Sequence, residues 1–107
     1  MDADHALSMH VTEHDGICTL VLKGELDMAS APGLRERLLD LFAGGVRQVV
    51  IDLAELTYVE SVGLGVLVGA LKRYRAAAGD LQLRGPRGQV SEVLELTSLA
   101  QVFRVEP

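Results

Sequence analysis

The chain has 107 residues, and fifteen Asp and Glu against ten Lys and Arg give it a formal net charge of −5. This length corresponds to one domain, and a hydrophobic fraction of 49% excludes a disordered chain. The acidic balance argues against the basic face that nucleic-acid binding requires, so we expect no nucleic acid among the partners.

Membrane and secretion patterns are not found in the sequence. The longest stretch without a charged residue is Ser61–Leu71, whereas a bilayer-spanning helix needs about 20 apolar residues. The acidic N-terminus lacks the basic-then-apolar pattern of a signal peptide. Cys18 is the single cysteine, so it forms no internal disulfide and is expected to pack as a small buried hydrophobic residue. The sequence therefore predicts a cytoplasmic protein without membrane insertion.

The N-terminal part of the chain predicts a β-hairpin. Residues 1–7 are expected to form a loose leader that precedes one domain over residues 8–107. Residues 8–14 alternate between polar and apolar types, and Ile17–Lys23 is rich in β-branched and aliphatic residues. Because Asp15-Gly16 between these runs is a turn signal, the two runs predict antiparallel strands.

A helix and a buried strand are predicted next. Ser30 can serve as the helix N-cap, Pro32 suits its first turn, and Gly44-Gly45 ends it. The apolar face of this helix comprises Leu34, Leu38, Leu41 and Phe42. Val49–Leu53 is an almost continuous apolar run, which is typical of a strand in a parallel sheet.

The second half of the chain predicts two further helices and two short strands. The second helix is marked by apolar residues at i, i+3, i+4 and i+7, namely Leu64, Leu67, Val68 and Leu71. Its last turn carries a cluster of cations suited to the helix dipole, namely Lys72, Arg73 and Arg75. A strand over Leu81–Arg84, a third helix containing Val90 and Leu94, and a last strand over Val102–Val105 complete the chain.

The order β-β-α-β-α-β-α-β predicts a single α/β domain with a mixed sheet that begins in the N-terminal hairpin. Parallel strands are connected by right-handed crossovers. If every crossover advances in the same direction, the helices pack mainly on one face of the sheet. The order of the strands stays open.

The most informative stretch is the apolar strand Val49–Leu53, a loop, and then the motif Tyr58–Leu67, which holds a serine, two glycines and the start of a helix. It resembles the STAS family, and most closely the single-domain anti-sigma factor antagonists, whose pattern here is Asp-Ser-small-Gly-Leu-Gly-x-Leu. Gly24–Asp27 and Leu94–Leu99 match further pieces of the family in the same order. The resemblance covers roughly residues 8–105 and implies a STAS-like fold.

The resemblance implies that Ser61 is a phosphate acceptor. In the family, the unphosphorylated antagonist binds an anti-sigma factor that is also a serine kinase, and phosphorylation separates the two proteins. A serine phosphatase removes the phosphate and restores the binding form, and this cycle regulates sigma-factor-dependent transcription. The resemblance therefore implies that the antagonist is not an enzyme and needs no cofactor or metal. The residues implied in partner binding are Glu25, Asp27, Glu60, Ser61, Val62, Gly63 and Gly65.

The charges of the chain fit this role. A phosphate adds about −1.5 to −2 charges, and at Ser61 it would lie beside Glu60 and, in the family's arrangement, near Asp27. Residues 1–54 hold nine acidic and four basic residues, so the acidic excess lies in the half that contains Asp27. Like charges would then repel a partner, while unpaired N–H groups at the helix start tolerate the phosphate. The two glycines would let a partner backbone approach closely.

Other interpretations of these residues stay open. Ser61 can be an ordinary helix N-cap, and Glu25 and Asp27 can be ordinary loop acids. Glu60 stands where the family usually has Asp, and Val62 stands where it usually has Ser, Thr or Ala. Val62 leaves Ser61 as the only hydroxyl of the motif, whereas Glu60 motivates an alternative, a non-phosphorylated scaffold subunit of a transport or signalling complex.

Two enzyme classes do not fit the motif. Gly63, Gly65 and Gly69 miss the dinucleotide pattern G-x-G-x-x-G, because the third glycine comes one position late. The hydrolase pattern G-x-S-x-G lacks its first glycine, because position 59 is Val. The histidines are expected to be exposed leader and strand residues rather than a catalytic base or a metal cluster, and they are His5, His10 and His14.

Overall fold

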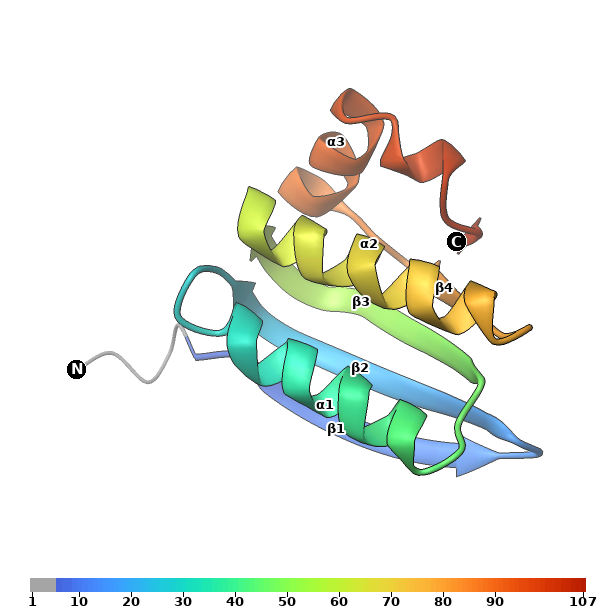
Figure 1. The fold of residues 1–107 in the computed structure, drawn as a ribbon. Coiled ribbons are helices and arrows are strands. Elements are labelled where there is room, and N and C mark those ends of the chain that lie inside the picture. The colour runs from blue at the N-terminus through green and yellow to red at the C-terminus, as the bar shows by residue number, and fades with distance from the viewer. Residues whose placement is uncertain (1–5) are drawn as a thin grey trace.

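A computed structural model describes residues 6–107, which form a five-stranded sheet and three α-helices (Figure 1). The first two strands pair antiparallel and every later strand joins the sheet parallel to its neighbour. The predicted α/β class, hairpin and mixed sheet are confirmed. In the sheet the strands keep the order of the chain, namely β1 (Ser8–His14), β2 (Ile17–Leu26), β3 (Gln48–Val59), β4 (Asp80–Arg84) and β5 (Val105–Glu106).

The helices connect the parallel strands. Each crossover advances by one strand, so right-handed connections place the helices on one face of the sheet. Figure 1 shows α1 and α2 lying side by side across the sheet, with α3 beyond α2. The helical segments are α1 (Ala31–Ala43), α2 (Ser61–Ala76), α3 (Gly88–Leu96) and a 3₁₀ turn, η2 (Leu99–Gln101).

The core lies between the helices and the sheet. Cys18, Leu20 and Leu22 are buried at alternate positions of β2, as expected for a strand with one face against helices. Leu7 packs against this core, although residues 1–7 were expected to be a loose leader; residues 1–5 of that leader lie outside the described part of the chain. The predicted apolar faces of the helices supply the other side of the core, through Leu34, Leu38, Leu64, Leu67, Leu71, Val90 and Leu94.

Three boundaries differ from the sequence prediction. β3 continues past Leu53 to Val59, and β2 includes residues 24–26, where a loop was expected. Both extensions pair with each other as far as Leu26 and Val59, and such pairing between distant segments leaves no periodic pattern. The last strand is shorter than predicted, because Phe103 turns into the core and only Val105–Glu106 pairs with β4.

Tyr74 joins α2 to α1 inside the core. Its side chain is fully buried, and its hydroxyl donates a hydrogen bond to the carbonyl oxygen of Leu38 at 2.8 Å. The ring also meets Phe42 edge-on, with 5.1 Å between the ring centroids. Burial raises the pKa of Tyr74 to about 12. The neutral phenol is therefore part of the packing between the two helices.

We expect the free energy of unfolding to fall as the pH rises from about 10 to about 12. Tyr74 keeps its proton in the folded state up to a pKa of about 12, whereas an unfolded tyrosine ionises near pH 10. Ionisation thus favours the unfolded chain. The difference of about two pKa units lowers the free energy of unfolding by up to about 2.7 kcal/mol. Urea unfolding at both ends of this range measures the effect. Tyr74→Phe should lack this component; equal pH dependence in both proteins would contradict the assignment.

Candidate functional site

The residues of the predicted site meet where β2 and β3 end and α2 begins. Glu25 pairs with Tyr58 in the parallel register, and Leu26 pairs with Val59. The next residue continues this alignment, since the N–H of Glu60 donates to the carbonyl oxygen of Leu26 at 3.0 Å. Two segments that are far apart in the sequence therefore form one edge of the domain.

Glu60 bridges these two segments through its carboxylate. Oε1 accepts a hydrogen bond from the N–H of Met28, and Oε2 accepts one from the Tyr58 hydroxyl, both at 3.2 Å. The backbone of Glu60 occupies the N-cap position of α2, but its side chain makes no capping bond. The carboxylate therefore ties the segment after β2 to the start of α2.

The edge carries a concentration of negative charge. The charge of Glu60 raises the pKa of the Tyr58 hydroxyl above its usual value, with smaller contributions from partial desolvation and from the hydrogen bond to Glu60. The carboxylates of Glu25 and Asp27 raise this pKa further. Three acidic side chains from two segments thus act on one exposed phenol, in agreement with the expected proximity of Glu25 and Asp27 to the serine motif.

Asp27 orders the segment that leads from β2 into α1. Its Oδ1 accepts hydrogen bonds from the N–H groups of Ala29 and Ser30 at 3.1 and 3.0 Å. Ser30 is the N-cap residue, as predicted, but its hydroxyl donates to the carbonyl oxygen of Glu25 at 2.9 Å instead of capping the helix. These bonds hold the chain so that the side chain of Met28 is 75% exposed.

Ser61 is the first residue of α2 and is exposed. Its interpretation as the helix N-cap is wrong, because Glu60 holds that position and no side chain caps the helix. The first N–H groups of an uncapped helix face solvent and carry partial positive charge. Val62, the next residue, is 42% exposed. The structure thus presents a hydroxyl and an apolar side chain together at the helix start.

The two glycines of the motif have different surroundings. Gly63 is buried, and a Cβ atom there would lie 2.5 Å from Cγ and 2.8 Å from Cδ2 of Leu26. Gly65 is exposed, and a Cβ atom there would meet nothing within 4 Å. Both glycines were expected to let the backbone of a partner approach closely. This expectation is wrong for Gly63, because the side chain of Leu26 already packs against it.

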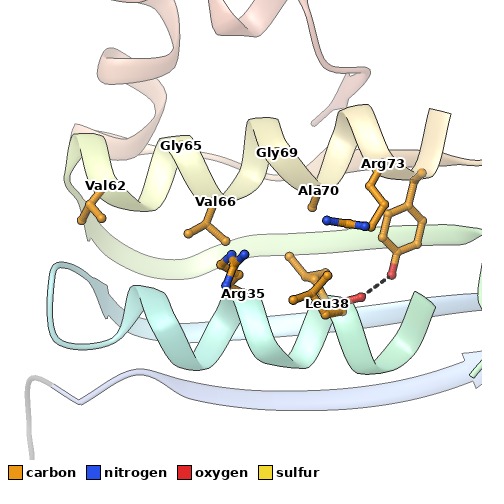
Figure 2. Close-up of a pocket in the computed structure, with 10 residues that line it drawn as sticks. Arg35, Leu38, Val62, Gly65, Val66, Gly69, Ala70 and Arg73 are labelled. Atoms are coloured by element: carbon orange, nitrogen blue, oxygen red, sulfur yellow. Dashed lines mark hydrogen bonds between the residues drawn. The ribbon is translucent and has the colours of Figure 1, made fainter. Parts of the chain in front are cut away.

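A groove follows the seam between α1 and α2, beginning beside Ser61 (Figure 2). It has a volume of about 360 Å³. At the basic end of α2, Arg73 is exposed and lines this groove, and Arg75 pairs with Asp80 at 2.9 Å. The lining residues are Arg35, Leu38, Leu39, Val62, Gly65, Val66, Gly69, Ala70, Arg73 and Tyr74.

Residues 6–107 show no metal site and no membrane-spanning helix. No group of three or more His, Cys, Asp and Glu side chains there is placed to hold a metal ion. His14 lies next to Asp15 at 3.2 Å with both side chains exposed, and His5 is outside the described residues. Within the same residues, every helix is too short or too polar to cross a bilayer.

Comparison with known proteins agrees with this geometry. The family model of the STAS domain matches residues 8–107. The anti-sigma-B factor antagonists of Staphylococcus aureus and Staphylococcus epidermidis are each 29% identical over 99 residues, which is 92% of this chain and 92% of theirs. An anti-sigma factor antagonist from Mycobacterium paratuberculosis superimposes with a TM-score of 0.89 and 25% identity, covering 100% of this chain and 91% of that one.

A further solved structure shows the same fold at lower identity. SpoIIAA in its unphosphorylated form matches with a TM-score of 0.79 and 22% identity, over 92% of this chain and 87% of that one. The match to the family model extends from β1 to the end of the chain and includes every residue of the site. The chain belongs to the STAS domain family.

Proposed function

We propose that this protein is an anti-sigma factor antagonist that works by partner switching. Unphosphorylated, it binds an anti-sigma factor with serine-kinase activity and so frees a sigma factor in the cytoplasm. Phosphorylation of Ser61 separates the two proteins, and a serine phosphatase restores the binding form. The kinase and the phosphatase supply the chemistry, so the antagonist itself needs no catalytic residue, cofactor or metal.

The exposed position of Ser61 at the uncapped start of α2 carries this proposal. The names of relatives that match over nearly their whole length support it. The hydroxyl is accessible to a kinase, and N–H groups at the start of the helix can donate hydrogen bonds to a phosphate without unfolding the helix. The modified domain can therefore keep its structure and still change its affinity.

The proposed partner surface surrounds this serine. It combines exposed apolar side chains with carboxylates, a composition that suits a regulated protein interface. Met28 and Tyr58, which the sequence analysis did not name as binding residues, lie next to Glu60 and are exposed. Gly63 supports the surface from inside the domain. The proposed contact residues are Glu25, Asp27, Glu60, Ser61, Val62 and Gly65, with Met28 and Tyr58 added.

Charge explains how phosphorylation would release the partner. A phosphate at Ser61 brings about −1.5 to −2 charges to an edge where Glu60, Glu25 and Asp27 already act together on Tyr58. A partner that accommodates three carboxylates and a small hydroxyl then meets a bulky dianion in the same place. Repulsion and desolvation both oppose the complex.

Incubation with an anti-sigma kinase from the same genome and ATP tests the proposal. We expect the wild-type protein to gain the mass of one phosphoryl group, and Ser61→Ala to gain none. Ser91→Ala, which removes a hydroxyl from α3, is the matched control and should behave as the wild type. A Ser61→Ala protein that still gains one phosphate would remove Ser61 from the proposal.

A non-phosphorylated scaffold subunit is the second candidate, because the Glu60 carboxylate beside Ser61 is already bonded to Met28 and Tyr58. If the protein is a scaffold, a partner should bind the wild-type protein. The mass of the wild-type protein should then stay unchanged after incubation with any kinase and ATP. The kinase assay described for Ser61 therefore separates the two functions. A stable complex whose antagonist never gains a phosphate would favour the scaffold.

A further inference from the structure

We propose that the groove between α1 and α2 binds an acidic, amphipathic helix of the partner protein. The inference rests on the proposed function, because the groove begins at Val62, next to Ser61. Two arginines line it: Arg35 comes from α1 and Arg73 from α2 (Figure 2). None of the ion pairs within residues 6–107 includes either guanidinium group.

The groove is longer than a small ligand needs. Two further hollows adjoin the central one and share its lining residues. One, of about 380 Å³, reaches Ala31 at the start of α1, and the other, of about 530 Å³, reaches Ala76 at the end of α2. From Val62 to Ala76 a helix rises by about 21 Å. A groove of this length between two parallel ridges is suited to a third helix.

The surface of the groove is apolar and allows a close approach. Leu38, Ala70 and Tyr74 are buried and form its floor. Gly65 and Gly69 lie one turn apart on α2, and a Cβ atom at either position would meet nothing within 4 Å. An incoming helix can therefore come near the backbone of α2 and bury apolar side chains against the floor.

The charges select an acidic helix. Figure 2 shows the Arg35 side chain reaching toward Val66 of α2, while Arg73 lies further along the groove near Ala70. Val66 and Ala70 are four residues apart, so the two cationic groups are separated by about 6 Å along α2. Two acidic residues four positions apart on a partner helix would face both arginines.

The same charges set the position of the partner helix along the groove. Glu36 lies at the end of the groove near Val62, and the carboxylates around Ser61 lie beyond it. Lys72 joins Arg73 at the opposite end. An acidic helix is attracted toward the Lys72 end and repelled from the Ser61 end, so these charges set its position along the groove while the edge at Ser61 provides the switch.

A synthetic helical peptide tests the groove without the natural partner. The probe carries two Glu residues four positions apart beside Leu on one face, and the control peptide has Lys at the same two positions. In NMR titrations of the ¹⁵N-labelled protein, we expect saturable shifts at the amides of Val66, Gly69 and Arg73. The affinity of the Lys peptide should be lower by a factor of about ten or more.

Variants assign the effect to the arginines. Arg35→Gln with Arg73→Gln should reduce binding of the Glu peptide about tenfold, to the level of the Lys peptide. Arg104→Gln removes an exposed arginine outside the groove and should leave binding unchanged. Equal binding of the two peptides, no shift at the groove amides, or an unaffected double variant would overturn the proposal.

The kinase assay distinguishes this inference from the proposed function. The double variant keeps Ser61, and it should be phosphorylated about tenfold more slowly at low kinase concentration because the partner docks less well. If the wild type is phosphorylated and the double variant reacts at the same rate, the groove inference fails while the proposed function stands. If the wild type is not phosphorylated, the proposed function fails, and the peptide titration still decides whether the groove binds an acidic helix.

Discussion

Ser61→Asp is expected to weaken binding of the anti-sigma factor by about 100-fold, which corresponds to about 2.7 kcal/mol. The new carboxylate would join an edge where Glu60, Glu25 and Asp27 already raise the pKa of Tyr58. Like charges brought together at an interface cost several kcal/mol. The fold should remain intact, because an acidic residue in the first turn is favourable to the helix dipole.

Titration calorimetry with the purified anti-sigma factor measures this loss. Ser61→Asn is the matched control, since it has nearly the size of Asp without its charge, and it should keep most of the affinity. Raising the salt concentration should narrow the gap between the two variants, because exposed charges are screened. If Ser61→Asn loses as much affinity as Ser61→Asp, size rather than charge controls release. Melting temperatures confirm that both variants are folded.

Gly63→Ala is expected to destabilise the domain by about 2 kcal/mol. A Cβ atom would lie 2.5 Å from Cγ of Leu26, which is fully buried at the end of β2. Either the leucine leaves its place or the start of α2 moves away from β2. Since α2 begins at Ser61, such a movement would also displace the proposed phosphate acceptor.

Thermal unfolding checks this prediction, and for a domain of this size 2 kcal/mol lowers the melting temperature by about 10 °C. Gly65→Ala is the matched control on the same helix. Its Cβ would meet open space, so the higher helix propensity of Ala should stabilise the protein by about 0.5–1 kcal/mol. Equal effects of the two changes would mean that Gly63 does not make the close contact with Leu26.

These two predictions give the glycines of the serine motif separate roles. Gly63 is required by packing inside the domain, and Gly65 leaves the outer surface of α2 open beside the groove. The motif therefore encodes both the position of Ser61 and the surface that follows it. From the sequence pattern alone, both glycines would be expected to let the backbone of a partner come close.

Much of the fold could be predicted from local patterns. The 3.6-residue period marked α2 through Leu64 and Leu71, and the β-branched and aliphatic content of Ile17–Lys23 marked β2. These patterns arise because every helix and strand must turn its own apolar side chains toward one core. The boundaries of β2 and β3 were missed, because they depend on pairing between segments that no local pattern connects.

The sequence by itself determined the order of the elements, the family resemblance and Ser61 as the candidate acceptor, because each depends on residues close together in the chain. Only the tertiary structure decided that Glu60 bonds to Met28 rather than capping α2, and that Arg35 and Arg73 share a groove. Those relations join residues from different elements. Their distances are set by the packing of α1 and α2 on the sheet, which no spacing in the sequence records.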